Sequence, residues 1–285
     1  SVNPKVGIEH RLDILESNPL PSMKIAVIGG GPAGMKTAME LCDRGHKVTL
    51  FEADEKLGGA IKHAEYVDFK WTLNDFRKYL IRQVEKRDID VRLNTRATPE
   101  MVRAEGFDMV IPALGATPSL PPIPGIDKPH VMVATQSMIH PETVGQNVVV
   151  IGGGEVGVEA GMNLAKKGHN VTVLEMQGKL AAESTMIHYY SMFEEAWLAL
   201  PTFHWQLNAT VTGIQDDCVT YKDQEGAEHA IPCDSVVVSL GMKPLTDEAL
   251  SFYGSADRFA LVGDCRKSAT VEQAMRSAYA VSHSV

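Results

Sequence analysis

Two sets of glycines in this sequence are spaced as in a loop that binds phosphate groups. They stand at Gly29, Gly31 and Gly34 and again at Gly152, Gly154 and Gly157. In such a loop the first glycine permits a tight turn, the second lets a pyrophosphate approach the backbone, and the third lets a helix pack closely on a strand. The helix would begin between the second and third glycines, where its N–H groups attract an anion. The residues at that point are Pro32 and Ala33 in the first set and Glu155 and Val156 in the second.

An acidic residue follows each set at the same spacing. Glu52 and Glu175 each lie 18 residues after the last glycine of their set. A carboxylate at that distance falls at the end of the next strand, where it can accept hydrogen bonds from an adenosine ribose. One GxGxxG pattern is a weak signal, but two with an acid at identical spacing predict two dinucleotide sites. Glu175 should also repel a 2'-phosphate, which favours NADH over NADPH, although the nearby Lys179 weakens that preference.

The elements that must position these residues form an internal repeat. The segment Lys24–Asp54 recurs as Asn147–Gln177. Each copy has the pattern of a buried strand, a glycine turn, a helix and a second strand that ends in glutamate, which is a βαβ unit. The repeat continues in Asp108–Pro118 and Asp234–Pro244, each of which is typical of a closing strand followed by Leu-Gly.

This repeat predicts an α/β protein with two Rossmann-like dinucleotide-binding domains, the second inserted in the first. The glycines of the two Leu-Gly pairs, Gly115 and Gly241, are included among the expected cofactor-binding residues. The proline-rich segment Pro118–Gly125 breaks regular structure and marks a crossing between the domains. The expected organisation is a linker from a missing N-terminal region over 1–21, an FAD-binding domain over 22–118 and 245–285, and an NAD(H)-binding domain over 119–244.

The rest of the chain fits between these units. Apolar residues at helical spacing predict a helix over Trp71–Lys86, and short β-forming runs predict strands at Val91–Leu93 and Met109–Ile111. The segment Phe203–Ser239 alternates β-forming residues around a turn at Asp223–Gly226. This alternation predicts a small antiparallel β-meander.

Residues outside the glycine sets assign the first site to FAD and the second to NAD(H). The pair Gly58-Gly59 leaves room for a bulky ligand beside the chain. Asp264 could bind a polyol such as ribityl, and Thr270 starts a capping box, so that the helix beginning at Val271 would point its N-terminus at the flavin pyrimidine. Asp264 and Thr270 also have a purely structural interpretation, as caps of a turn and of a helix.

Composition excludes several other classes of function. The chain has 285 residues, 44% of them hydrophobic, which suffices for two cores. The net charge of -9, with acidic and basic residues interspersed, argues against a nucleic-acid surface. No apolar run approaches the roughly 18 residues of a membrane helix. We therefore expect small-molecule ligands, no nucleic acid and no membrane, with formation of a homo-oligomer left open.

The four cysteines form no CxxC or CxxxxC pair, which indicates neither zinc nor a redox-active dithiol and fits a reducing, cytoplasmic location. Cys218 and Cys233 could face each other across the meander turn, or could be two small apolar strand residues, which is the interpretation we favour. Other histidine and aromatic residues are expected to pack in the fold rather than to bind a metal or a base. They are His63, His140, His188, His204, Tyr189, Tyr190, Trp197 and Trp205.

Together these residues resemble the flavoproteins of the pyridine nucleotide-disulfide oxidoreductase type. Leu114-Gly115 and Leu240-Gly241 look like the ATG crossover motifs of that group, with Leu in place of Thr. Val262-Gly263-Asp264 looks like its second FAD motif. The chain departs from the disulfide reductases because no cysteine pair lies where the first domain would present it to the flavin.

The chain is more similar to the C-terminal module of the old yellow enzyme-type NADH:flavin oxidoreductases, the group of 2,4-dienoyl-CoA reductase, 2-enoate reductase and trimethylamine dehydrogenase. Phe69–Lys86 is similar to the helix after the Gly-Gly pair in that family, and Ser1–His10 resembles the stretch after its last iron-sulfur cysteine. The resemblance implies an N-terminal TIM barrel with FMN and substrate and a linking 4Fe-4S cluster, all in a part of the protein outside this chain.

The same resemblance implies a function. NADH would deliver hydride to FAD, and electrons would pass through the cluster to FMN, which would reduce an activated C=C bond. Hydride transfer requires position more than an acid or a base, so no residue is expected to be catalytic. One alternative is a stand-alone NADH:acceptor reductase that feeds a ferredoxin-like or rubredoxin-like partner. Another is a non-catalytic module in which ADP fills the first site to support assembly.

Overall fold

The computed structural model describes residues 2–7, 21–182, 184 and 189–285. The chain divides into two compact units, of which unit 1 comprises Ser1–Thr117 and Met242–Val285 and unit 2 comprises Pro118–Gly241. The divisions lie close to the crossings expected at residues 118–119 and 244–245. The α/β fold class expected from the internal repeat is confirmed, because each unit is built on its own parallel sheet.

Unit 1 has a sheet in the strand order β15-β4-β1-β2-β3, in which every pair of neighbours is parallel. The strands are β1 (Lys24–Ile28), β2 (Lys47–Phe51), β3 (Ile89–Arg92), β4 (Met109–Pro112) and β15 (Arg258–Phe259). The central strand β1 is almost entirely buried, as expected for a parallel strand covered on both faces.

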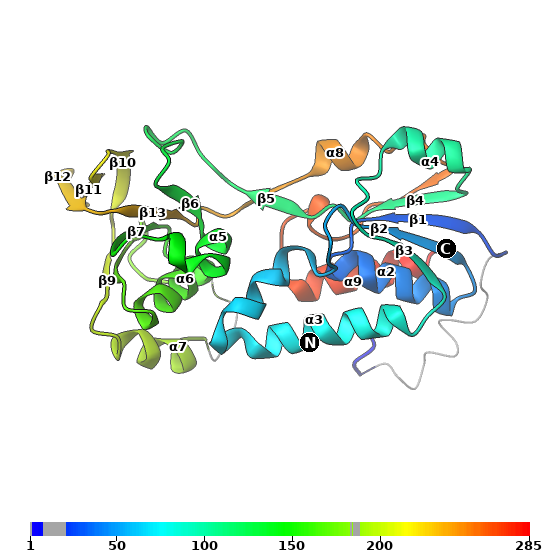
Figure 1. The fold of residues 1–285 in the computed structure, drawn as a ribbon, viewed down its shortest axis with the longest axis horizontal. Helices are drawn as coiled ribbons and strands as arrows, with labels where there is room; N and C mark the ends of the chain where they lie inside the picture. The colour runs from blue at the N-terminus through cyan, green and yellow to red at the C-terminus, as the bar shows by residue number, and fades with distance from the viewer. Residues whose placement is uncertain (1, 8–20, 183, 185–188) are drawn as a thin grey trace. The chain divides into compact units, whose positions relative to one another are not determined.

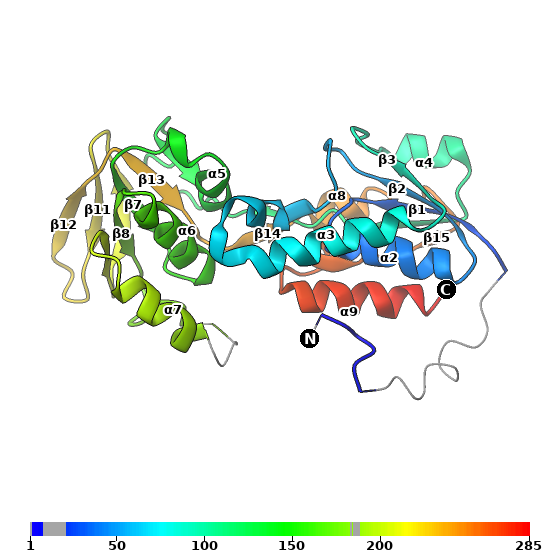
Figure 2. The same ribbon diagram turned by 60° about the horizontal axis from the view of Figure 1, so that its bottom comes forward.

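Helices cover both faces of this sheet (Figures 1 and 2). On one face lie α2 (Pro32–Asp43), α3 (Trp71–Glu85) and α9 (Val271–Ser282), and on the other α4 (Pro99–Glu105) and α8 (Thr246–Leu250). The connections include three short 3-10 helices, η2 (Gly59–Tyr66), η3 (Asp68–Lys70) and η5 (Gly263–Cys265). The predicted helix at Trp71–Lys86 is confirmed as α3.

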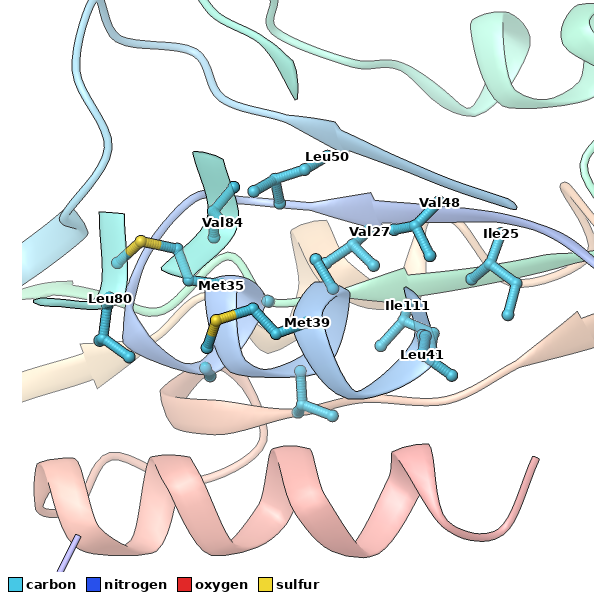
Figure 3. Close-up of a cluster of buried hydrophobic side chains, with 14 of the residues drawn as sticks. Ile25, Val27, Met35, Met39, Leu41, Val48, Leu50, Leu80, Val84 and Ile111 are labelled. Carbon is cyan, nitrogen blue, oxygen red and sulfur yellow. The ribbon is translucent and has the colours of Figure 1, made fainter. Parts of the chain in front are cut away.

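Alternate residues of β1 divide the core of unit 1. Ile25 and Val27 face a cluster with the methionines of α2 and with Leu80 and Val84 of α3 (Figure 3). Ala26 and Ile28 belong instead to the cluster formed with α4 and the segment after α8. Because side chains alternate along a strand, one short apolar run supplies both faces of the sheet.

Unit 2 has a second parallel sheet, in the order β6-β13-β7-β8-β9. Its strands are β6 (Val131–Val133), β7 (Asn147–Ile151), β8 (Asn170–Leu174), β9 (Phe203–Gln206) and β13 (Ser235–Val238). The helices of this unit are α5 (Ala134–Ile139), η4 (Pro141–Thr143), α6 (Glu155–Lys166) and α7 (Tyr189–Leu198). Helix α6 packs on β8 and α5 packs on α6.

An antiparallel meander covers part of unit 2 and is shorter than expected. It consists of β10 (Thr210–Ile214), β11 (Cys218–Lys222) and β12 (Glu228–Pro232). Its apolar side chains pack with Val149, Ile151, Val236 and Val238 of the parallel sheet. The prediction was wrong at both ends, since β9 and β13 pair in that parallel sheet. The fully buried pattern of β13 is that of a central parallel strand rather than of a meander.

The strand register of β11 and β12 excludes the facing cysteine pair. Cys218 lies opposite Pro232, and Cys233 follows the strand, buried, with its N–H donated to the carbonyl of Asp217 at 2.9 Å. Both cysteines are free thiols. The favoured interpretation of two small apolar residues therefore holds, and burial raises the pKa of the Cys233 thiol to about 11.

The two crossings of the chain pair with each other as β5 (Ala116–Pro118) and β14 (Met242–Pro244). Ser119 donates its N–H to the carbonyl of Gly241 at 2.9 Å, and Leu245 donates to the carbonyl of Gly115 at 3.1 Å. Both glycines have left-handed backbone, with φ of +78° at Gly115 and +84° at Gly241, which other residues adopt at a cost. The two Leu-Gly pairs thus end their closing strands in the same way.

The expected linker over 1–21 lies mostly outside the described residues. Within 2–7, Lys5 approaches Glu40 of α2 at 3.9 Å and lies over the ring of Tyr279 at 5.7 Å, so this segment contacts unit 1. His188 lies outside the described residues, as does the side chain of Tyr189. In the described part of the chain, none of the helices combines the length and apolar composition needed to cross a lipid bilayer.

Candidate functional site: two glycine loops and their glutamates

The first and third glycines of each loop are required by the fold itself. In unit 1, a Cβ on Gly34 would lie 1.8 Å from the carbonyl oxygen of Gly29, and a Cβ on Gly29 would lie 2.6 Å from that of Ala113. In unit 2, a Cβ on Gly157 would lie 1.9 Å from the carbonyl oxygen of Gly152. These contacts are far below any tolerated Cβ distance, so only glycine lets the helix start this close to the strand.

The second glycines, Gly31 and Gly154, are not required by the fold in this way. Their φ values of −73° and −66° are open to any residue. A Cβ on Gly154 would meet nothing within 4 Å, and one on Gly31 would meet only the Cα of Gly59, at 3.8 Å. Each is the N-cap of its helix, α2 or α6, and a glycine supplies no side chain to the N–H groups of the first turn. The space and the N–H groups fit a ligand phosphate.

A buried glutamate closes each loop in the same way. The Glu52 carboxylate accepts N–H bonds from Gly30 at 2.8 Å and from Asp54 at 2.9 Å. The Glu175 carboxylate accepts them from Gly153 at 2.6 Å and from Gln177 at 2.7 Å. The exposed fractions are only 8% and 7%, so these backbone donors replace water and hold each carboxylate in one orientation.

Sequence reasoning missed the glycine that lies between the first and second of each set. A Cβ on Gly30 would lie 2.8 Å from Glu52 and 2.3 Å from Leu57, and a Cβ on Gly153 would lie 2.9 Å from Glu175 and 2.7 Å from Leu180. The signal was present, because both copies have three consecutive glycines where the motif requires only two. Leu57 and Leu180 are a further matched pair, each five residues after its glutamate.

The pair Gly58-Gly59 lies against the first loop. Gly58 donates its N–H to the carbonyl of Gly30 at 2.9 Å, and a Cβ on Gly59 would lie 2.8 Å from the Cα of Gly31. In unit 2 the matching bond comes from Ala181, which donates to Gly153 at 2.7 Å. The glycine pair therefore lets the chain pass directly over the second glycine in unit 1, whereas no described residue of unit 2 lies within 4 Å of a Cβ on Gly154.

The structure brings Gly263, the neighbour of Asp264, to the same loop. A Cβ on Gly263 would lie 2.7 Å from the Cβ of Ala33, so the segment containing Asp264 lies beside the start of α2. Burial raises the pKa of the Asp264 carboxyl, and the N–H of Ala269 opposes this rise. Thr270 caps α9 by accepting the N–H of Gln273, and Val271 begins that helix. The capping interaction predicted for Thr270 is confirmed.

A buried histidine lies next to the glycine pair of unit 1. His63, in the helix η2 that begins at Gly59, is buried, and burial lowers its pKa to about 4. Its Nδ1 lies 2.8 Å from the carbonyl of Ala60.

In unit 2, the Lys179 ammonium lies over the ring of Tyr190 at 3.6 Å. Lys179 is therefore engaged by an aromatic face rather than extended toward the ribose of a ligand.

Two tryptophans pack against aromatic neighbours in unit 2. Trp197 is buried edge-on against Tyr190, with ring centroids 6.0 Å apart, which confirms its expected packing role. Trp205 lies against Phe203, also at 6.0 Å. Among the described residues, no three His, Cys, Asp or Glu side chains come together as metal ligands would.

Comparison with known proteins identifies the family. The family model for pyridine nucleotide-disulphide oxidoreductases matches residues 23–260, and the chain belongs to this family. Membership implies binding of FAD and NAD(P)H, and the two loops fit these dinucleotides.

The chain is similar to parts of longer reductases. It is 34% identical to bilirubin reductase of Mediterraneibacter gnavus over 98% of this chain and 43% of that protein, and 29% identical to cinnamate reductase of Clostridium sporogenes over 100% and 42%. The structure of 2-naphthoyl-CoA reductase matches with a TM-score of 0.93 and 28% identity, over 99% of this chain and 43% of that one. The chain thus spans less than half of these relatives. The predicted relationship to the flavin-binding module of old yellow enzyme-type reductases is confirmed.

The contrast between the second and third glycines predicts opposite outcomes for the same substitution. Gly154→Ala should leave the free energy of unfolding within about 1 kcal/mol of wild type, because the new Cβ meets open space and normal backbone. If unit 2 binds NADH as the sequence predicts, the same change should weaken NADH binding at least about tenfold, because the methyl would occupy the space expected for the pyrophosphate. Gly157→Ala should cost about 2 kcal/mol or more of stability, since its Cβ clashes with Gly152. Urea unfolding and NADH fluorescence titration measure both, and unchanged NADH affinity in Gly154→Ala would contradict the ligand role.

The buried His63 predicts loss of stability in acid. Its pKa of about 4 in the folded chain is below the ordinary value of about 6.5, so between these pH values the unfolded chain binds the additional proton. The free energy of unfolding should therefore fall by up to about 3 kcal/mol as the pH falls from 6.5 to 4. His63→Gln should flatten the dependence of unfolding free energy on pH, measured with urea at pH 7 and 4.5. His46, whose pKa burial also lowers, is present in both proteins and cancels in the comparison. Parallel curves would show that His63 does not titrate in this way.

Proposed function

We propose that this chain is the electron-input module of a flavin-dependent reductase. Unit 1, expected from the sequence to span 22–118 and 245–285, holds FAD. Unit 2, expected to span 119–244, holds NADH. Hydride passes from NADH to FAD, and electrons continue through a 4Fe-4S cluster to an FMN-containing TIM barrel, where an activated C=C bond of a small molecule is reduced. The cluster and the barrel belong to a part of the protein N-terminal to this chain.

The observation that carries the proposal is the pair of second glycines. Gly31 and Gly154 are explained neither by backbone conformation nor by packing, whereas the first and third glycines of each set are explained by packing and the first also by left-handed backbone. A ligand that approaches the backbone supplies the missing reason. We expect the glutamates, each buried and oriented by backbone amides, to accept hydrogen bonds from the hydroxyls of a ribose.

The surroundings of the loops support FAD in unit 1. Gly59 lies over Gly31, and Gly263 brings Asp264 to the start of α2, so this loop has walls that the loop of unit 2 lacks in the same form. We expect Asp264, when ionised, to accept hydrogen bonds from the polyol of FAD. The N-terminus of α9, capped by Thr270, supplies partial positive charge that suits a reduced flavin.

FAD, once bound, supplies the chemistry, because a flavin accepts a hydride and releases its electrons singly. The chain's own residues bind and orient the two dinucleotides, and none of them needs to move a proton. The full proposed set is Gly29, Gly31, Pro32, Ala33, Gly34, Glu52, Gly58, Gly59, Gly115, Asp264 and Val271 for FAD, and Gly152, Gly154, Glu155, Val156, Gly157, Glu175 and Gly241 for NADH.

The relatives support the direction of electron flow and the class of substrate. Bilirubin reductase and cinnamate reductase are named for reductions, as is 2-naphthoyl-CoA reductase, and each is more than twice as long as this chain. The additional length is where we place the barrel, the FMN and the cluster. The four free cysteines suit a cytoplasmic protein.

The visible spectrum of the purified chain tests the proposal. We expect a yellow protein with the absorption of FAD, which bleaches on anaerobic addition of NADH. A colourless protein that binds ADP but not FAD would support the non-catalytic alternative and overturn the proposal. Transfer of electrons from the reduced module to a ferredoxin or rubredoxin, in a protein whose gene encodes no upstream barrel, would support the stand-alone reductase instead.

Glu175 predicts the choice between NADH and NADPH. Glu175→Arg should raise the ratio of kcat/KM for NADPH over NADH at least about tenfold, because repulsion of the 2'-phosphate becomes attraction. Glu175→Gln, which keeps the shape of the side chain, should shift the ratio less. Glu228→Arg is the matched control, since it makes the same charge change at an exposed residue of β12. Stopped-flow reduction of FAD by each nucleotide gives the ratio, and equal ratios in all four proteins would refute the role of Glu175.

A further inference from the structure

A buried arginine lies beside the Gly58-Gly59 pair. Arg77 is on α3, and although this helix is amphipathic, Arg77 points inward with Leu80 and Val84 and is only 5% exposed. Burial of a guanidinium is costly unless its donors are paired. A cation at this position therefore calls for a specific role.

The guanidinium of Arg77 bridges the two flanks of the glycine pair. Its Nη1 donates to the carbonyl oxygen of Leu57, before the pair, at 3.5 Å. Its Nη2 donates to the carboxylate of Glu65, after the pair, at 2.8 Å. Its Nε donates to Asn74 on the same helix at 3.3 Å, which fixes the plane of the fork. The planar fork of arginine suits this bridging, whereas a lysine ammonium would not span both partners.

The stem of Arg77 also packs on the pair directly. A Cβ on Gly58 would lie 2.8 Å from Cδ and 3.2 Å from Cγ of Arg77, and Gly58 has a φ of +134°. Gly58 in turn donates to Gly30, and Gly59 lies against Gly31. A continuous series of contacts thus runs from the arginine to the glycine that faces the ligand phosphate.

Unit 2 lacks this arrangement. Its matching turn carries Ala181, with φ of +46°, in place of Gly58. The sequence of unit 2, Pro118–Gly241, contains no arginine at all. Arg77 therefore belongs to the features that distinguish the loop assigned to FAD from the loop of unit 2.

We propose that Arg77 is a positioning residue for FAD, which holds the Gly58-Gly59 turn against Gly31 so that the turn forms a wall of the flavin site. It acts through the turn and not by contact with the ligand. This inference rests on the proposed function of unit 1.

Arg77→Met keeps an apolar stem and removes the fork, and it should raise the dissociation constant of FAD at least about tenfold, as expected when a buried charge network is broken. Arg77→Lys should recover part of the affinity. The affinity for NADH should stay within about twofold, because unit 2 is not involved. Quenching of flavin fluorescence by the apoprotein measures the first constant, and NADH fluorescence measures the second. A less structured flavin absorption band in Arg77→Met would report a looser site, which a change in overall stability alone would not produce.

Two further variants keep the test decisive. Arg82→Met makes the same change at an exposed position of α3 and should leave FAD binding unchanged. Glu65→Gln removes the charge at the more exposed end of the pair, where the side chain is 44% exposed, and should weaken FAD several-fold even if Arg77→Met fails to fold. FAD affinities within twofold of wild type in Glu65→Gln and in a folded Arg77→Met, or equal losses of FAD and NADH binding, would overturn the inference. A wild-type chain that binds no FAD would instead overturn the proposed function itself.

Discussion

The close approach of a helix to the end of a strand is the constraint on which the rest of the molecule depends. It occurs twice, where Gly34 meets the carbonyl of Gly29 and where Gly157 meets that of Gly152. Because the helix starts so near the strand, the loop between them is short, and its backbone N–H can reach the glutamate at the end of the neighbouring strand. Each loop is thereby organised before any ligand arrives, so little ordering remains to be done on binding.

The two units share this loop and differ in what surrounds it. In unit 1, α9 packs against α2, and the glycine pair lies over the loop and contacts Arg77. In unit 2, the meander β10–β12 packs on one face of the parallel sheet, and Ala181 stands in place of Gly58. The glycine loop and its glutamate are thus common to both units, whereas the segments around the loop differ. This pattern is consistent with two dinucleotides that share an adenosine half and differ beyond it.

Local patterns made much of the fold and site predictable. The two loops, their glutamates, α3 and the cap at Thr270 depend on residues close in sequence, where spacing carries the information. Strand partners depend on distant residues, so β9 and β13 were placed in the meander although they pair with β8, β7 and β6. The register of β11 and β12 differs by one residue from the one that would make Cys218 face Cys233. The reason is that the turn extends to Ala227, whose carbonyl accepts the N–H of Asp223. Arg77 was missed because a lone arginine in an amphipathic helix has the pattern of a solvent-facing residue.

The pairing of β5 with β14 has a consequence for how the chain is made. Unit 2 is one continuous stretch, whereas the sheet and helices of unit 1 are completed only by α8, β15 and α9, which are synthesised after it. The whole inserted unit is therefore synthesised while the outer unit still lacks an edge strand and two helices. A folded insert whose ends already lie side by side brings β5 and β14 together, which removes most of the entropy cost of closing so long a loop. The order of synthesis and the topology of the chain thus both favour folding of unit 2 before unit 1.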